Sequence, residues 1–386
     1  MQPTLIWDIP TRLFHWTLAL SFAGAWLTSE ADAWLSVHVF LGYLMLGLIV
    51  FRVIWGFTGT HYARFASFWF SPKEALSYLR DVISNRAARH LGHNPTGSLA
   101  IYLLLALTLV VGFTGFFTLG VEEQHGAVAG WRAITQGRFF KKLHEFSAIV
   151  MLLLVFGHLA GVIVESWLHK ENLARSMLTG IKLSDLGAVR VKARAGVALL
   201  LLALMLSFGG WWFFYTVQAP VQKQLGVAAA GKTPPVAFVG PKLADNAQWR
   251  EECGSCHLAF HPSLLPSRSW VRIMSEQKQH FGSDLGLDAA TSTAVLSFMT
   301  GNAAERHQTE PATKIDLSLK AEVTPLRITE TPYWLKKHRD IAQADWGSSL
   351  VKSKSNCTAC HLDAEAGTFE DAAMRIPARP NPTASQ

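Results

Sequence analysis

Charged residues are scarce in this chain of 386 residues. Asp, Glu, Lys and Arg make up 16% of it, whereas hydrophobic residues make up 50% and the mean hydropathy is positive. Soluble globular domains carry about 25% charged residues. This composition excludes a chain that is soluble along its whole length and favours one that lies partly in a membrane.

Long apolar runs are absent after residue 218 and frequent before it. Five windows are long enough to cross a bilayer as helices, near residues 13–29, 35–57, 97–119, 143–168 and 195–217. The stretch that follows them is rich in Ala, Gly and Pro, as linkers are. We therefore expect a mainly α-helical fold with a four-helix membrane bundle over residues 1–190, a fifth transmembrane helix over 191–217, a linker over 218–245 and a small helical domain over 246–386.

Cysteine is scarce as well, and no cysteine is left over for a disulfide. All four lie in two copies of one motif, "CGSCH" at 253–257 and "CTACH" at 357–361. In a C-x-x-C-H motif the two thiols attach c-type haem and the next residue ligates its iron. The alternatives are a redox dithiol or half of a zinc site. The motifs predict two covalent c haems, held by Cys253, Cys256, His257, Cys357, Cys360 and His361.

The formal net charge of +7 does not indicate a nucleic-acid partner. Residues 1–215 hold 17 Lys and Arg against 11 Asp and Glu, while the remainder holds 18 against 17. Basic residues gather in the loops after the second and fourth windows, and the positive-inside rule places these loops and the N-terminus in the cytoplasm. Five crossings then put the C-terminal domain in the periplasm of a bacterial inner membrane. No cleavable signal peptide is evident.

Four histidines lie in the apolar windows, where a polar side chain usually has a partner or a cofactor. His144 and His158 are fourteen residues apart, which places them on one helix face about 21 Å apart along the axis. With the orientation above, depth pairs His15 with His158 and His38 with His144. Two such pairs suit six-coordinate b-type haem, whereas zinc would require about four ligands at each site. We expect two non-covalent b haems.

Two arginines share the depth of the His15 and His158 pair. Arg12 lies near the start of the first window, and Arg52 lies inside the second. An arginine inside a membrane requires an anion, which a haem propionate would supply through charge-assisted hydrogen bonds. Snorkelling of Arg52 to the interface is the alternative.

The first half of the chain resembles a known family. The segments "WDIPTRLFHW", "RVIWGFTGTHYARF" and "RHLGHNPTG", with the helix of His144 and His158, are similar to the bacterial cytochrome b561 family, which is related to the cytochrome b subunit of nickel hydrogenases. The resemblance covers roughly residues 5 to 185. It implies a four-helix di-haem b protein that exchanges electrons with the quinone pool, and its ligand pattern falls on His15, His38, His144 and His158.

Roughly residues 240 to 380 resemble the soluble di-haem cytochrome c family. The pattern "VRIMSEQKQHFG" predicts a short helix stopped by Gly282, and in "TPYWLKKHRD" Thr331 and Pro332 predict an N-cap and a first turn. In the family both irons are bis-histidine, which implies that His280 and His338 are the distal ligands opposite His257 and His361. Three methionines remain rival ligands: Met274, Met299 and Met374.

These features indicate a membrane electron-transfer protein with four haems. It would connect the quinone pool with a periplasmic electron-transfer protein, either as a quinol:cytochrome c-type oxidoreductase or as an electron carrier. One alternative is an oxidoreductase that acts on superoxide or another small oxidant at the outer b haem. A basic loop would attract the anionic oxidant. That loop holds Arg132, Arg138, Lys141 and Lys142. A haem-based sensor is a further alternative. Weak candidates for a quinone site are His61, Arg64 and His93.

Overall fold

The chain forms two compact units in a computed structural model, and each is described by itself. The first unit comprises Met1–Thr118 and Arg138–Tyr215, and the second comprises Leu119–Gly137 and Thr216–Gln386. The structure describes residues 2–30, 34–123, 125–128, 137–185, 188–214, 241–370, 373–374 and 377. Most of the predicted linker over 218–245 lies outside the described residues.

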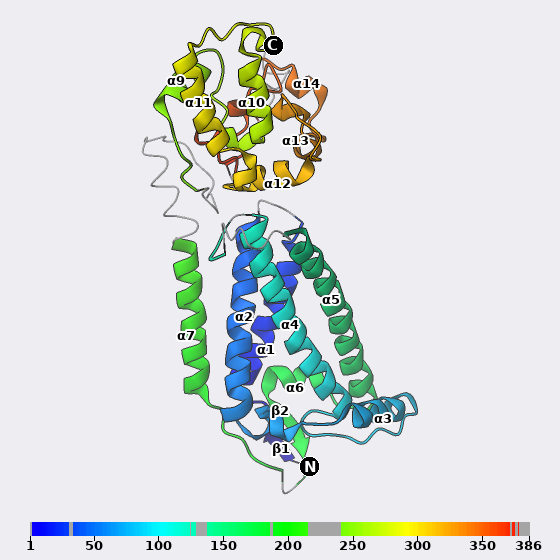
Figure 1. The fold of residues 1–386 in the computed structure, drawn as a ribbon. Coiled ribbons are helices and arrows are strands. Elements are labelled where there is room, and N and C mark those ends of the chain that lie inside the picture. Colours follow the sequence, from blue (N-terminus) through cyan, green and yellow to red (C-terminus); the bar gives the residue numbers. More distant parts are fainter. Residues whose placement is uncertain are drawn as a thin grey trace, which may run out of the picture. The chain divides into compact units, whose positions relative to one another are not determined.

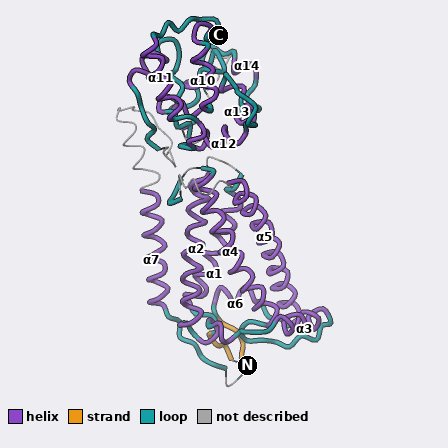
Figure 2. Tube along the Cα trace, viewed as in Figure 1, coloured by secondary structure: helices purple, strands orange, loops and turns teal. Residues whose placement is uncertain are grey.

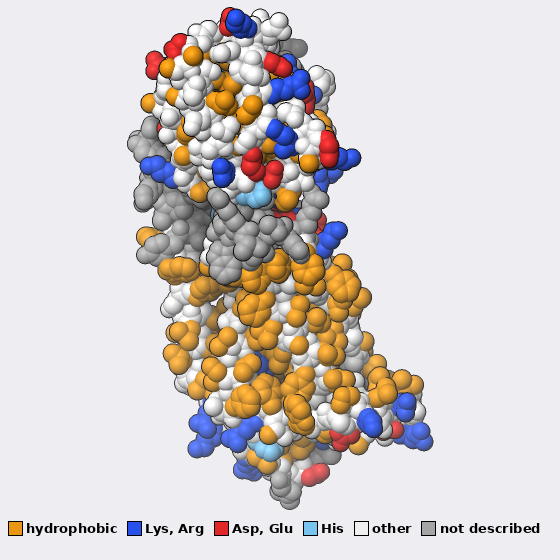
Figure 3. Space-filling view, viewed as in Figure 1, with side chains coloured by type: hydrophobic (Ala, Val, Ile, Leu, Met, Phe, Trp, Pro, Cys, Tyr) orange, Lys and Arg blue, Asp and Glu red, His pale blue; other side chains and the backbone are white. Residues whose placement is uncertain are grey.

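Four helices of the first unit are long and apolar enough to cross a membrane. They are α2 (Leu35–Thr58), α4 (Pro95–Val121), α5 (Gly137–Leu168) and α7 (Ala195–Trp212), and Figure 1 shows them side by side. Their outer faces carry exposed leucine, isoleucine, valine and phenylalanine side chains, which Figure 3 shows as a broad hydrophobic surface over the helices. This surface suits lipid, and the mainly helical fold predicted from the sequence is confirmed.

The first predicted span is the helix α1 (Ile9–Leu27), which packs along α2. It is not among the four helices that satisfy both length and hydropathy, because polar side chains such as Thr11, Arg12 and His15 interrupt its apolar sequence. Asp8 caps its start by accepting a hydrogen bond from the Thr11 backbone N–H, and Pro10 occupies its first turn. The described residues thus contain four clear candidate spans, where the sequence suggested five.

A two-stranded sheet lies at one end of the helices. Strand β1 (Gln2–Leu5) pairs antiparallel with β2 (Ile181–Ser184), so that Gln2 lies opposite Ser184. The shorter elements around it are α3 (Pro72–Ile83), α6 (Leu173–Thr179), η2 (His61–Ala63) and η3 (Phe65–Ser67). Figure 2 shows the sheet at the end that holds α3 and α6, and Figure 3 shows Lys and Arg gathered there. The N-terminus and both basic loops therefore share one end of the first unit.

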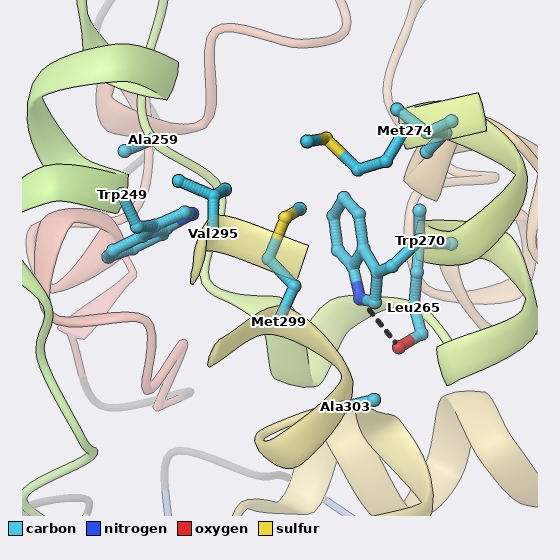
Figure 4. Packing of buried hydrophobic residues seen from close by; sticks show 9 residues of the cluster. Trp249, Ala259, Leu265, Trp270, Met274, Val295, Met299 and Ala303 are labelled. Carbon is cyan, nitrogen blue, oxygen red and sulfur yellow. Dashed lines mark hydrogen bonds between the residues drawn. The ribbon is translucent and has the colours of Figure 1, made fainter. Parts of the chain in front are cut away.

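The second unit is a small helical domain. Its α-helices are α9 (Ala247–Gly254), α10 (Ser267–Ser275), α11 (Ala289–Gly301), α12 (Glu310–Ser318), α13 (Pro332–Lys337) and α14 (Gln343–Trp346). Its 3₁₀ helices are η5 (Pro262–Leu264), η6 (Gln277–Gln279), η7 (Ala304–Arg306), η8 (Ile328–Glu330), η9 (Cys357–Ala359) and η10 (Ala364–Ala366). Its main core contains Trp249, Trp270, Met274, Val295 and Met299 (Figure 4).

The two helices predicted around the distal histidines differ in outcome. The helix expected to run to Gly282 was wrong, because α10 ends at Ser275 and η6 leads into His280. Phe281 has φ +50° and Gly282 has φ +98°, so the chain turns through the left-handed region directly after the histidine. The second helix was right: Thr331 caps α13 by accepting from the Trp334 N–H, and Pro332 begins it.

Candidate haem-binding sites

The ring of each C-x-x-C-H histidine lies close to the ring of a second histidine. The ring centres of His257 and His280 are 6.3 Å apart, and those of His338 and His361 are 6.2 Å apart. With a metal–nitrogen bond of about 2 Å on each side, two imidazoles that ligate one ion have ring centres roughly 6 Å apart. Both pairs fit bis-histidine iron, and they are the pairs that the family resemblance implied.

Two of these histidines are already oriented by the backbone. His257 Nδ1 lies 2.7 Å from the Leu258 carbonyl oxygen, and His338 Nδ1 lies 2.9 Å from the Trp334 carbonyl oxygen. A ring whose Nδ1–H donates to a carbonyl presents its unprotonated Nε2 as the ligand atom. Burial lowers the pKa of His280, and the charges of His257 and Arg327 lower it further, so this imidazole stays neutral and able to bind metal.

The four cysteines are free thiols beside these pairs. Burial raises the pKa of Cys253 to about 11, with a further contribution from Glu252, and burial raises that of Cys357 to about 11. Redox-active C-x-x-C motifs work through a thiol whose pKa is lowered. The surroundings of these cysteines therefore argue against a redox dithiol and suit thioether attachment.

One pair of membrane histidines has the same geometry. The ring centres of His38 on α2 and His144 on α5 are 6.0 Å apart. His38 Nδ1 lies 2.8 Å from the Ala25 carbonyl oxygen, and His144 Nδ1 lies 3.0 Å from that of Val111 on α4. Gly115 allows this approach, because a Cβ at its position would lie 2.9 Å from His144 Cε1. Both Nε2 atoms are thus left for a shared ion.

The second membrane pair predicted from depth is His15 on α1 and His158 on α5. His15 Nδ1 is buried and has no hydrogen-bond partner within the described part of the chain. The ring thus has a buried polar atom still to be satisfied, and iron bound through one ring nitrogen is compatible with that position.

The two arginines predicted to bind haem propionates each have a buried N–H group without a hydrogen-bond partner among the described residues. Arg52 is only 4% exposed, its guanidinium lies 4.7 Å from the Phe65 ring centre, and its Nη1 has no hydrogen-bond partner among the described residues. Arg12 donates to the Leu178 carbonyl oxygen, and its Nε is likewise buried without a partner there. Buried Arg52 does not snorkel to an interface, and both arginines have donors available for a carboxylate.

The rival methionines occupy other positions. Met274 and Met299 are 5% and 3% exposed and lie in the core beside Trp270, whose Nε1 donates to the Leu265 carbonyl oxygen at 3.0 Å (Figure 4). Met374 pairs through its backbone with His361. With His280 and His338 already opposite the motif histidines, the geometry favours histidine over methionine at both distal positions.

Sequence reasoning missed a buried carboxylate next to these sites. Asp8 is 1% exposed and accepts hydrogen bonds from Thr60 Oγ1 at 2.6 Å and Trp55 Nε1 at 3.2 Å, besides that of Thr11. It joins the start of α1, which carries His15, to the end of α2. The sequence signal was the N-cap pattern "WDIPT", in which Asp precedes a proline.

Two family descriptions match the chain. Residues 6–180 match "Prokaryotic cytochrome b561", and residues 249–369 match "Dihaem cytochrome c". The chain is a prokaryotic cytochrome b561 fused to a dihaem cytochrome c domain. The b561 region is similar to the "Probable Ni/Fe-hydrogenase B-type cytochrome subunit" of Rhizobium leguminosarum bv. viciae, with 25% identity over 47% of this chain and 90% of that protein.

Further relatives cover both regions. A "Probable Ni/Fe-hydrogenase 1 B-type cytochrome subunit" of Escherichia coli K12 is 20% identical over 49% of this chain and 95% of its own length. The solved structure "Diheme cytochrome c from Rhodobacter sphaeroides" is 35% identical over 33% of this chain and 100% of that chain, with a TM-score of 0.30. A diheme cytochrome type c from Shewanella baltica OS155 is 29% identical, with 35% and 95% covered and a TM-score of 0.29.

The two families give the coarse function. The cytochrome b561 region is a multi-pass membrane protein that binds b haem, and the dihaem cytochrome c domain carries two C-x-x-C motifs for covalent c haem. Haem of both types moves single electrons. The protein is therefore a membrane haem protein of electron transport.

Proposed function

We propose that this cytochrome carries electrons between the quinone pool and a periplasmic redox protein through four haems. The observation that carries the proposal is the set of three neighbouring imidazole pairs, whose ring centres lie 6.0, 6.2 and 6.3 Å apart. Facing imidazoles fill both axial positions of an iron. Such a site transfers electrons and has no position open for a substrate.

The residues divide among four sites. His38 and His144 hold one b haem, and His15 and His158 hold the other, with Arg12 and Arg52 binding its propionates. Each c haem is attached to one cysteine pair, with His257 and His280 as axial ligands of the first and His361 and His338 of the second. The haems supply one-electron chemistry. The chain contributes axial ligands, burial and the hydrogen bonds that fix each ring.

The proposed orientation rests on charge. The loops after α2 and α5 are basic, and Figure 3 shows Lys and Arg gathered at that end of the first unit. The positive-inside rule puts this end in the cytoplasm of a bacterial inner membrane. With α1 crossing alongside α2, α4, α5 and α7, the chain leaves α7 on the periplasmic side, and the dihaem domain meets its partner there.

Quinol oxidation by the purified full-length protein tests the proposal. Addition of a short-chain quinol under anaerobic conditions should reduce the b haems first and the c haems afterwards, as followed by their separate α bands. His144→Ala should slow reduction of the c haems by more than tenfold. It removes a ligand of the b haem proposed between His38 and His144, through which electrons would reach the c haems. Reduction of the c haems at an unchanged rate in this variant would contradict the proposed route, and no reduction by quinol would contradict the quinone assignment.

Carbon monoxide distinguishes electron transfer from gas sensing in the dihaem domain. The ferrous c haems should not react with carbon monoxide at neutral pH, because both axial positions of each iron are taken by His257 and His280 or by His361 and His338. His280→Ala should open one position and create one carbon-monoxide-binding haem, whereas His261→Ala, at a buried histidine bonded to Ser263, should not. Rapid binding by the unmodified protein would favour the sensor.

The small-oxidant alternative depends on the loop between α4 and α5. Arg132 lies outside the described residues, and Lys141 and Lys142 are exposed on the first turns of α5. Exposed lysines are common on protein surfaces and do not by themselves indicate an anion site. Electron transfer therefore remains the proposed function.

A further inference from the structure

A group of titratable side chains lies at the basic end of the first unit, away from the paired histidines. Glu165, near the end of α5, is 8% exposed. Its Oε2 lies 3.1 Å from His169 Nε2, off the line of a hydrogen bond, and 3.2 Å from Tyr78 Oη on α3. The ring of His90 stands edge-on to that of Tyr78 at 5.3 Å. We call Tyr78, His90, Glu165 and His169 the Glu165 cluster.

The contacts of Tyr78 are compatible with two protonation states of this cluster. Tyr78 Oη lies 2.9 Å from the Ala88 carbonyl oxygen and 3.2 Å from Glu165 Oε2, yet a phenol has one proton to donate. If Glu165 is ionised, Tyr78 satisfies only one of the two acceptors. If Glu165 is protonated, it donates to Tyr78 and Tyr78 donates to Ala88, so both contacts are made. The geometry therefore accommodates one additional proton.

A neighbouring carboxylate has different surroundings. Glu171 lies 3.0 Å from Arg89 Nε and 3.8 Å from Lys182 Nζ, so two basic side chains pair with it. Lys182 also donates to the His90 carbonyl oxygen at 3.2 Å. Glu165 instead faces a phenol and an imidazole, which gain and lose protons more readily than Arg or Lys. By their contacts, Glu165 and its neighbours are therefore the groups suited to proton exchange, while Glu171 is held in ion pairs.

The cluster shares the helix face of a proposed iron ligand. Glu165 follows His158 by seven residues on α5, which places it within about 20° of the same face and about 10.5 Å further along the axis. At that distance in a weakly polar interior, two charges still interact appreciably. The other charged groups that face the cluster are Asp81, which acts on Tyr78, and Lys182, which acts on both His90 and Glu165.

His93 connects the cluster to the haem end electrostatically. Its ring lies 4.7 Å from that of Trp7 and 4.3 Å from that of Phe68, and its Nδ1 is buried without a partner in the described structure. It interacts with the charges of Arg52, Lys182 and His158. Lys182 in turn interacts with Glu165.

We infer that the Glu165 cluster takes up one proton when the haem held by His15 and His158 gains one electron, and releases it when that electron leaves. The proton comes from water at the basic end of the unit and is held on Glu165, which then donates to Tyr78, so that the positive charge lost at the iron is restored nearby. The inference rests on the proposed haem assignment. It deepens the proposed function, because quinone reduction consumes two electrons and two protons, and it places proton exchange at the end of the basic loops.

Potentiometric titration of the full-length protein between pH 6 and pH 9 tests this inference with chemical mediators and no quinone. The b component that His158→Ala removes should have a midpoint potential that falls with rising pH, approaching about 59 mV for each tenfold change in proton concentration, the value for one electron and one proton. Glu165→Gln should reduce this slope by at least half. Tyr78→Phe keeps the ring and removes the hydroxyl, and it should reduce the slope as well.

Glu171→Gln is the matched control, since it makes the same chemical change six residues away and should leave the slope intact. An unmodified protein without a pH slope, or Glu165→Gln with the full slope, would overturn the inference. If Glu165→Gln fails to bind haem, the slope of Tyr78→Phe decides. Because the titration contains no quinone, a protein that shows the slope but does not react with quinol would contradict the proposed function alone.

Discussion

A histidine serves as an axial ligand only when its ring is held in one tautomer and one orientation. In this protein a backbone carbonyl fixes the tautomer and the orientation of four of the eight proposed ligands. The carbonyls are those of Ala25, Val111, Leu258 and Trp334. These bonds explain why the facing rings keep their separation. They also identify the accepting carbonyls as part of three of the four proposed sites, which the residue types alone do not.

Removal of single histidines should distinguish the two b haems. His158→Ala removes a ligand of the haem at the basic end, and His144→Ala removes a ligand of the other haem. Low-temperature absorption spectra of the two variants should therefore lack different b components, each about half of the total b absorbance. Loss of the same component in both variants would refute the pairing by depth.

His93 should make stability depend on pH. Burial, with help from the charges of Arg52 and Lys182, lowers its pKa to about 3, whereas an unfolded histidine titrates near 6.5. Below pH 6.5 the unfolded chain binds a proton that the folded chain does not, so the free energy of unfolding falls by about 1.4 kcal/mol per pH unit until the folded pKa is reached.

The measurement compares thermal unfolding at pH 7 and pH 5. The unmodified protein should lose about 2 kcal/mol more than His93→Asn over this interval, since the variant lacks the group that titrates. His61→Asn, at an exposed histidine, is the control and should behave like the unmodified protein. An equal loss in all three proteins would show that His93 is not the source.

At the scale of single elements, α5 is the helix that links the proposed membrane sites. His144, His158 and Glu165 follow one another at multiples of seven residues and share one face. The helices α1 and α2 supply the partner histidines, and α4 supplies the carbonyl that orients His144. In the proposed arrangement, one helix thus carries a ligand of each b haem and one member of the Glu165 cluster, so the spacing of these residues follows from helical geometry.

Asp8 should stabilise the junction of α1 and α2. Asp8→Ala leaves the donors of Thr11, Thr60 and Trp55 buried without an acceptor, and we expect a loss of roughly 3 kcal/mol or more. Ser71→Ala, which breaks the exposed capping box of α3, should cost only about 1 kcal/mol. Heat denaturation followed by loss of b-haem absorbance gives both values. Equal effects would contradict the role of Asp8.

At the scale of the whole molecule, two families of haem protein are joined in one chain. The b561 region buries its cofactors between apolar helices, and the dihaem cytochrome c domain binds its cofactors through thiols on a small helical core. The two modes of attachment differ chemically, because only the second is covalent. This difference allows the numbers of non-covalent and covalent haems to be measured separately.

The protein should contain two non-covalent and two covalent haems. Acid-acetone extraction should remove half of the iron porphyrin and leave half attached to the polypeptide. Cys357→Ala together with Cys360→Ala should lower the covalent share by half without changing the extracted amount. A ratio of b to c haem far from one in the unmodified protein would contradict the four-haem arrangement.

The sequence by itself determined the chemistry of this protein. Cys253, Cys256, Cys357 and Cys360 specify their chemistry through spacing alone, because the C-x-x-C-H motif is local. The apolar windows and the basic loops follow from hydropathy and charge, which also depend only on local sequence. The sequence overestimated the helix before His280, since periodicity does not show where Phe281 and Gly282 turn the chain.

Only the tertiary structure decided which side chains meet. The carbonyls that orient His38 and His144 belong to other helices, and Glu165 gains Tyr78 as a partner across 87 residues. Asp8 likewise accepts a hydrogen bond from Thr60, which follows the end of α2. Such contacts depend on how helices pack, and packing is set by side-chain shape over the whole unit, whereas sequence patterns report on a few neighbouring residues at a time.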